Sequence, residues 1–355
     1  MGAAPAGTLQ ALDLREVAMD AVWDTEIALV AWIQGWGTWL LAPMEAVSLL
    51  GSQALLVVFV PLLFWSVSAG LGARTYLVAA AGGVVNGLLK FALHGARPDW
   101  YHHGVRSLAP SHTFGAPSGH AQNSLMLWGY LALRLARRWA WYAAAAIVLA
   151  VALTRLYLGA HFLTDILLGW LVGAAMLWAV ARNEDALRAW WLRLGLAAQV
   201  VLALAVSAGP VLLAQGWETL VHAGWSAPED WTGAVPRGLG DGSVEHVARV
   251  AGGLFGGLAG FSVLAARGWY SAAGPLVSRV ARYVIGLSGI VLLLVVMRVA
   301  LPEAGGAAGA AVDFASFAVV ALWSALGAPE LFVLTGLARR PAPERAAEGP
   351  AARRE

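Results

Sequence analysis

The stretch GLLKFALHGARPDW (87–100) contains Lys90, the only lysine among the 23 basic residues of the chain. Arg97 follows seven residues later, which is two turns of a helix, so the two cations share a face while a helix lasts. Gly95 and Pro98 predict that this helix ends beside them. Two cations on one face repel each other unless an anion lies between them, so the pair indicates anion binding. Alternatively, both side chains only extend to the membrane–water interface and bind no ligand.

A second motif, PSGH, lies within FGAPSGHAQNS (114–124). Pro117, Ser118 and Gly119 open a predicted helix, with Ser118 as the cap of its free backbone N–H groups. A helix N-terminus attracts an anion through those groups and through the helix dipole. His120 falls in the first turn, where its protonated form is disfavoured unless an anion is present. A plain capped helix start with an interfacial histidine is the alternative.

A third motif lies within TRLYLGAHFLTDILLGW (154–170). His161 and Asp165 stand at i and i+4 of a helix, so the carboxylate can hold one imidazole nitrogen by a hydrogen bond. That contact fixes the tautomer and leaves the other nitrogen free as a nucleophile. Arg155 ends the preceding predicted helix and faces the same connection. A His–Asp pair at this spacing is common, so it gains weight only beside the other two motifs.

Composition identifies the elements that must hold these residues. The chain has 355 residues, of which 59% are hydrophobic and 12% charged, and its mean hydropathy is +0.68. Soluble domains carry about a quarter charged residues. Several runs reach the roughly 17–25 apolar residues that cross a bilayer. The sequence therefore predicts an all-α, polytopic membrane helix bundle. The net charge of +2 gives no indication of a nucleic-acid partner, and the absence of cysteine excludes thiol catalysis and Cys-based metal sites.

Nine spanning helices are predicted, at 53–70, 74–93, 117–137, 140–157, 162–182, 192–214, 246–266, 280–301 and 311–336. The Trp-rich segment 26–41 is interrupted by glycines and is predicted to form an interfacial helix, with a tenth span as the alternative. The predicted division of the chain is an N-terminal extracytoplasmic segment (1–52), a catalytic core (53–190), C-terminal transmembrane helices (191–338) and a disordered cytoplasmic tail (339–355).

The arginines predict the orientation. With the N-terminus outside, alternate connections and the C-terminal tail hold 15 of the 23 basic residues. The positive-inside rule places those connections in the cytoplasm. All three motifs then fall on the outer side, which predicts an integral protein of the bacterial inner membrane with its site facing the periplasm. Three cations, a helix N-terminus, two histidines and a carboxylate gathered there are what the hydrolysis of a phosphomonoester requires.

These motifs resemble the three signatures of the type 2 phosphatidic acid phosphatase (PAP2) superfamily, K-x6-R-P, P-S-G-H and S-R-x5-H-x3-D. Here they read KFALHGARP, PSGH and TRLYLGAHFLTD, and the only departure is Thr154 where serine is usual. The resemblance covers about 53–182. It implies a metal-independent phosphatase without a cofactor.

The resemblance also implies roles for individual residues. His161 is the nucleophile that forms a phosphohistidine, and Asp165 orients it. His120 protonates the leaving group and then activates water. The phosphoryl oxygens are held by Lys90, Arg97, Arg155 and the backbone amides of Ser118 and Gly119. A lysine is a point charge on a flexible stem that a forked guanidinium replaces poorly, which accounts for Lys90 in so arginine-rich a chain.

The predicted nine spans with an N-terminal interfacial helix are similar to the arrangement in sphingosine-1-phosphate phosphatases and glucose-6-phosphatases. Asp165 favours the lipid phosphatases, so the predicted substrate is a lipid phosphate or diphosphate. Phosphatidate, sphingoid-base phosphates and polyprenyl phosphates are the candidates. A sugar phosphate phosphatase is the alternative within the family. A lipid transporter or translocase is the alternative of another class, although no duplicated halves with broken helices are evident.

Weaker signals surround the motifs. Contacts to the substrate headgroup are predicted for Asp99, Trp100 and Tyr101. The histidines at 94, 102, 103 and 112 admit a metal cluster as a minor alternative. A stripe of small residues, formed by Gly252, Gly256 and Gly260, predicts close helix packing within the chain or, less strongly, a homo-oligomer.

Overall fold

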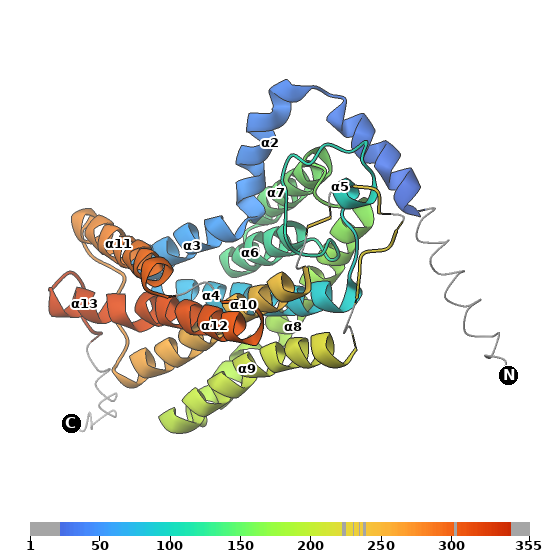
Figure 1. The fold of residues 1–355 in the computed structure, drawn as a ribbon. Helices are drawn as coiled ribbons and strands as arrows, with labels where there is room; N and C mark the ends of the chain where they lie inside the picture. Colours follow the sequence, from blue (N-terminus) through green and yellow to red (C-terminus); the bar gives the residue numbers. More distant parts are fainter. Residues whose placement is uncertain are drawn as a thin grey trace, which may run out of the picture.

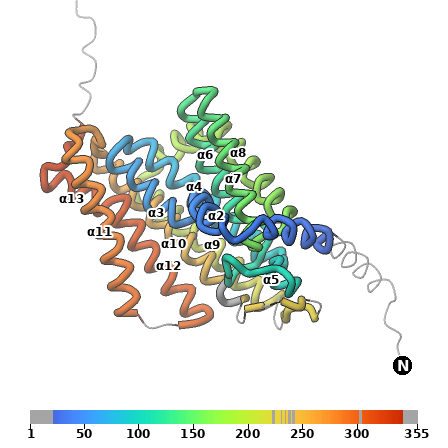
Figure 2. Tube along the Cα trace, turned by 90° about the horizontal axis from the view of Figure 1, so that it is seen from above, coloured from blue at the N-terminus to red at the C-terminus, as the bar shows by residue number. Residues whose placement is uncertain are grey.

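The computed structural model describes residues 22–221, 225–229, 231–233, 235–236, 239–301 and 304–341. In that part of the chain the secondary structure is helical throughout, which confirms the predicted fold class. Figures 1 and 2 show a bundle in which α6, α7 and α8 lie together on one side and α11 and α12 on the other. The connections around α5 gather at one end of the bundle, and α13 lies at the other end (Figure 1).

The helices that surround the three motifs are α4 (Ala69–Leu93), α5 (Pro98–Tyr101), α6 (Gly119–Leu135), α7 (Arg138–Tyr157) and α8 (Leu163–Arg193). Before them come η1 (Thr38–Leu40), α2 (Leu41–Ser48), η2 (Leu49–Gly51), α3 (Gln53–Leu62) and the π-helical η3 (Leu63–Val67). After them come α9 (Leu196–Leu220), α10 (Leu239–Ala266), α11 (Leu276–Ala300), α12 (Gly306–Leu322), the π-helical η4 (Trp323–Gly327) and α13 (Ala328–Leu334).

In the described chain, seven of the nine expected spans are helices of 20 or more residues that are apolar enough to cross a bilayer, and the bent pair Val22–Gln34 and Thr38–Gly51 makes an eighth if it counts as one span. The other two expected spans form shorter helical segments, Gln53–Val67 and the 17-residue Gly119–Leu135. The first ends at Ser68, whose extended backbone breaks the helix before α4. The second begins only after the Ser118 cap and ends at Ala136, which adopts a left-handed conformation.

The segment predicted as one interfacial helix at 26–41 is a broken pair. Its two parts, Val22–Gln34 and Thr38–Gly51, are bent by 85° relative to each other. Gly37 lies in the break with a φ of 108°, a conformation that residues with a side chain rarely adopt. The glycines that interrupt the apolar run therefore mark a sharp corner.

The C-terminal helices pack on the core through α10, which contacts α4, α9 and α12. The stripe of Gly252, Gly256 and Gly260 lies directly against Phe314, Ala318 and Ala325 of α12 and η4, so closely that a Cβ on any of the three glycines would clash. The stripe is therefore covered within the chain. The predicted use of this face for a homo-oligomer is replaced by the packing alternative.

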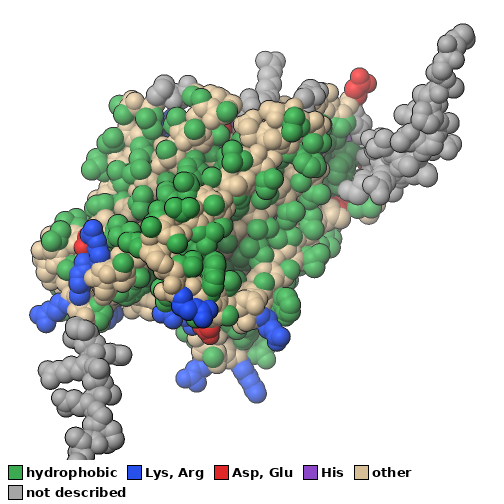
Figure 3. All heavy atoms as spheres, turned by 90° about the horizontal axis from the view of Figure 1, so that it is seen from below, with side chains coloured by type: hydrophobic (Ala, Val, Ile, Leu, Met, Phe, Trp, Pro, Cys, Tyr) green, Lys and Arg blue, Asp and Glu red, His purple; other side chains and the backbone are tan. Residues whose placement is uncertain are grey.

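The sides of the bundle present a broad hydrophobic surface, while Arg side chains gather at one end (Figure 3). Exposed Leu171, Leu212 and Leu292 belong to this surface, on α8, α9 and α11. Such an apolar exterior suits contact with lipid chains. The predicted division at 190/191 falls inside the last turn of α8, and residues 342–355 of the predicted tail lie outside the described chain.

Candidate active site

His161 lies in the short connection between α7 and α8, and Asp165 stands in the first turn of α8. Oδ2 of Asp165 is 3.2 Å from Nδ1 of His161 and also accepts the backbone N–H of Phe162 at 3.1 Å. When this carboxylate is ionised it only accepts hydrogen bonds, so that Nδ1 then carries the proton and Nε2 keeps its lone pair. The Phe162 contact anchors the carboxylate at the helix start, where the helix dipole favours a negative charge.

Lys90 ties the end of α4 to the segment that precedes α6. Its Nζ donates to the carbonyl oxygens of Phe114 and Gly115, at 2.5 and 2.7 Å. Only 5% of the residue is exposed. An ammonium group has three N–H donors, so one remains for a further acceptor in the site.

Arg97 joins the first motif to the other two. Its Nε and Nη2 donate to the carbonyl oxygens of Thr113 and Phe114, at 2.7 and 3.2 Å. Its Nη1 donates to the carbonyl oxygen of Ala160, next to His161, at 2.8 Å. The guanidinium also lies over the Trp100 ring, 5.5 Å from its centroid. These contacts fix the orientation of the Arg97 guanidinium group.

Arg155 approaches from the last turn of α7. Its Nη1 donates to the hydroxyl of Ser48 at 2.7 Å, so the N-terminal segment helps to position it. Its Nε is buried and has no hydrogen-bond partner among the described residues. A buried N–H group without an acceptor is costly, which makes this side of Arg155 ready to bind an anion.

The start of α6 completes the enclosure. The backbone N–H of Ser118 donates to the carbonyl of Asp165 at 2.9 Å, which joins the second motif to the third. The Ser118 hydroxyl caps the helix by accepting the N–H of Ala121 at 3.5 Å. Pro117 is held from α4 because the Asn86 side chain donates to its carbonyl at 3.3 Å. His120 is half-buried in the first turn of this helix.

The three cations of the site lack acidic partners. Lys90, Arg97 and Arg155 are all buried, and within the described residues no carboxylate oxygen lies within 4.0 Å of their nitrogen atoms. Buried charges are normally paired, so such a cluster favours an anion of more than one charge. Burial, together with these cations, lowers the pKa of His161 well below its usual value. The imidazole is therefore neutral at neutral pH.

Comparison with known proteins identifies the family of the chain. Residues 72–189 match the PAP2 superfamily, and residues 248–340 match the transmembrane extension of PAP2 superfamily phosphatases. The chain belongs to the PAP2 superfamily. The first match contains all three motifs, and the second covers the C-terminal helices from α10 onward.

One curated PAP2 relative is phosphatidylglycerophosphatase B of Bacillus subtilis (strain 168). It is 24% identical over 163 residues, which cover 42% of this chain and 78% of the relative. A crystal structure of a transmembrane PAP2 type phosphatidylglycerolphosphate phosphatase from Bacillus subtilis is also similar. It shares 24% identity, the match covers 48% of this chain and 87% of the other, and the TM-score is 0.40.

The three residues predicted to contact the substrate headgroup make contacts with other side chains of this PAP2 chain. Trp100 is only 1% exposed and packs against Phe114 and Trp231. The carboxylate of Asp99 accepts the hydroxyl of Ser107, and the Tyr101 hydroxyl donates to Asp24. These side chains form part of the walls of the site, and the Trp100 ring helps to orient Arg97. We do not assign them a contact with substrate.

The loop histidines also have structural contacts. The ring of His94 packs against that of Phe114 in a tilted arrangement, with centroids 4.3 Å apart, and the rings of His102 and His103 stack on each other at 4.8 Å. No group of three or more His, Asp or Glu residues is arranged to hold a metal ion in the described part of the chain.

Several supporting residues were not predicted from the sequence. The carboxylate of Glu26 accepts the backbone N–H and the hydroxyl of Thr164, one residue before Asp165. The Gln122 side chain accepts from Asn86 at 2.9 Å and donates to the Gly82 carbonyl, which fixes α6 against α4. An acid or an amide inside an apolar run signals a buried contact, although the partner is not visible in the sequence.

Proposed function

We propose that this chain is a membrane phosphatase that hydrolyses a lipid phosphate through a phosphohistidine on His161. Membership of the PAP2 phosphatases gives the reaction class. The observation that carries the proposal is the position of a neutral, carboxylate-oriented imidazole beside three buried cations that lack acidic partners.

The first half of the reaction forms the intermediate. Nε2 of His161 attacks phosphorus while the bond from phosphorus to the lipid oxygen breaks. Burial and the three cations lower the pKa of His120, and the bound phosphate anion offsets those cations, so that His120 takes up a proton in the complex. It gives this proton to the departing oxygen, which leaves as an alcohol. Lys90, Arg97, Arg155 and the backbone N–H of Gly119 balance the charge on the phosphoryl oxygens. The N–H of Ser118, predicted to share this role, instead donates to the carbonyl of Asp165.

The second half regenerates the enzyme. His120, now neutral, takes a proton from a water molecule that attacks phosphorus, and the bond from phosphorus to Nε2 breaks. Inorganic phosphate leaves and His161 is again neutral. Asp165 stabilises the positive charge that His161 carries in the intermediate and holds the ring in place. The chain itself supplies the positive charge at phosphorus, which supports a metal-independent reaction.

We also propose that the site opens to the periplasmic side of the inner membrane. Glu330 of α13 forms ion pairs with Arg267 and Arg340 at the end of the bundle remote from α5 (Figure 1). The positive-inside rule favours the cytoplasm for this arginine-rich end. The three motifs then meet at the opposite end, at about the depth of the lipid headgroups.

A lipid phosphate is the substrate class that suits this position. Phosphatidate, sphingoid-base phosphates and polyprenyl phosphates or diphosphates remain the candidates, and the curated relative adds phosphatidylglycerophosphate. The test is phosphate release by the purified protein from each lipid in mixed micelles, with glucose 6-phosphate for comparison. The proposal requires turnover of at least one lipid phosphate that is lost in His161→Ala. Faster turnover of glucose 6-phosphate than of every lipid would overturn the lipid assignment.

A further inference from the structure

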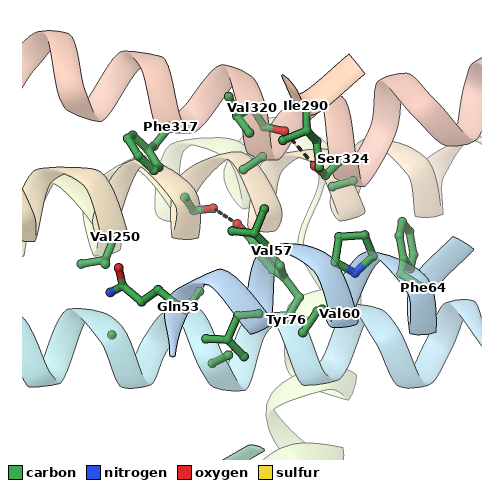
Figure 4. A pocket seen from close by; sticks show the side chains of 18 of the residues that line it. Gln53, Val57, Val60, Phe64, Tyr76, Val250, Ile290, Phe317, Val320 and Ser324 are labelled. Atoms are coloured by element: carbon green, nitrogen blue, oxygen red, sulfur yellow. Dashed lines mark hydrogen bonds between the residues drawn. The ribbon is translucent and has the colours of Figure 1, made fainter. Parts of the chain in front are cut away.

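A cavity of about 200 Å³ lies between the catalytic core and the C-terminal helices (Figure 4). The core side is formed by α3, η3 and α4, and the other side by α10, α11, α12 and η4. Val57, Val60, Ile290 and Phe317 are among the apolar side chains that line it. Val57 is 45% exposed, so the cavity reaches the lipid-facing surface along α3.

One end of this cavity is polar and lies close to the catalytic helix. Asn123 lines it from α6, three residues and therefore about one helical turn after His120. Gln53 lines it from the start of α3, and Gly51 just before it approaches the carbonyl of His120 so closely that a Cβ would come within 2.7 Å. Side-chain amides placed here can hydrogen-bond the ester or hydroxyl groups that link a lipid headgroup to its chains.

Arg249 contributes a charge to the same end. It is held by Asp313 at 2.8 Å and by Glu245 at 3.3 Å, so its charge is compensated within the protein. This guanidinium therefore differs from the three cations of the active site.

The other end of the cavity is closed by aromatic residues. The rings of Phe64 and Phe261 meet with their centroids 5.2 Å apart, and Trp65 is fully buried beside them. Along α10 the lining extends from Arg249 to Phe261, twelve residues or about 18 Å of helix. Since the hydrocarbon core of a bilayer is about 30 Å thick, this length is close to the depth of one leaflet.

We propose that this cavity holds a hydrocarbon chain of the lipid substrate while its phosphate lies at His161. The proposal rests on the proposed function and adds a role for the transmembrane extension. Its helices form half of a substrate site whose polar end adjoins the catalytic helix and whose apolar end receives the chain. A lipid enters sideways from the bilayer along α3.

The test compares two neighbouring valines with the same exposed fraction. Val57 and Val58 are each 45% exposed on α3, and only Val57 lines the cavity. Val57→Phe adds an aromatic ring to the cavity, and Val58→Phe adds the same ring to the lipid-facing surface. Both purified variants are assayed with short-chain and long-chain phosphatidate at the same surface concentration in mixed micelles. Ala80→Leu, which enters from α4 on the same, core side of the cavity, gives a second cavity variant should Val57→Phe fold poorly.

We expect Val57→Phe to lower kcat/KM for the long-chain lipid by about tenfold, the effect of excluding roughly two methylene groups from the cavity. The short-chain lipid should be hydrolysed at the wild-type rate, and Val58→Phe should change neither value. Equal long-to-short ratios in Val57→Phe, Ala80→Leu and wild type would overturn the proposal. Absence of phosphatase activity in the wild type would instead refute the proposed function, so the two failures are distinguishable.

Discussion

Oδ2 of Asp165 accepts two hydrogen bonds at once, from Nδ1 of His161 at 3.2 Å and from the backbone N–H of Phe162 at 3.1 Å. The second contact fixes the carboxylate to the start of α8, and the first fixes the imidazole to the carboxylate. The orientation of the His161 ring therefore depends on a contact at the helix start. This relationship leads to the first prediction.

Asp165→Asn should lower kcat by roughly 10²- to 10⁴-fold, because an amide no longer enforces the tautomer or stabilises a positive imidazole. KM should change little, since Asp165 does not bind the phosphoryl group. Glu26→Gln is the matched control, because Glu26 is a second buried acid that binds Thr164 and not His161. The measurement is kcat and KM of both variants. A drop of the same size in Glu26→Gln would assign the effect to the fold.

The pH dependence follows from the environment of His161. Burial and the neighbouring cations lower its pKa, so the neutral form that attacks phosphorus persists below pH 6.5. Activity that requires this form is present above the lowered pKa and is lost as the pH falls through it. Phosphorylation in a single turnover should therefore keep its rate at pH 6, after correction for the second ionisation of the substrate phosphate near pH 6. A rate that halves at pH 6.5 or above would contradict this assignment.

Lys90→Arg should lower kcat/KM by about 10- to 100-fold while the charge is kept. Lys90 directs a compact ammonium at two backbone carbonyls in a buried space, and a planar guanidinium does not reproduce those bonds. Arg106→Lys, in an exposed connection on the same side, is the control and should stay within twofold. Wild-type kinetics in Lys90→Arg would show that the site needs only charge at this position.

The reaction should proceed without a divalent metal ion. Three side-chain cations provide the positive charge around the phosphoryl group, so hydrolysis should persist in excess EDTA. Orthovanadate, which resembles pentavalent phosphorus, should inhibit. Activity that disappears in EDTA and returns with zinc or magnesium would contradict this part of the proposal.

The sequence predicts that the three motifs lie close together, because each motif is recognised from residues that are near one another in the chain. The spacing of Lys90 and Arg97, the helix start at Ser118 and the i,i+4 pair at His161 predict their elements without knowledge of distant contacts. The alternation of the connections across the membrane then places them on one side. The structure brings all of them together, through bonds such as that from Arg97 to the carbonyl of Ala160.

What could not be predicted depends on contacts between distant segments. Arg155 is positioned by Ser48, 107 residues earlier, and Thr164 is bound by Glu26, 138 residues earlier. The hydropathy of the sequence does not indicate which distant polar residues contact each other. The number of spans was also uncertain, since the breaks at Gly37 and Ser68 are backbone conformations and not changes in hydrophobicity.

The covalent intermediate tests the central claim most directly. Purified wild-type protein is mixed briefly with a lipid phosphate carrying ³²P, quenched in alkali and compared with His161→Ala and His120→Ala. The account predicts an alkali-stable, acid-labile label on the wild type and none on His161→Ala. His120→Ala should still be labelled slowly by a substrate with a good leaving group, because that oxygen needs little protonation. Labelling of His161→Ala at the wild-type level would contradict the assignment of His161 as the nucleophile.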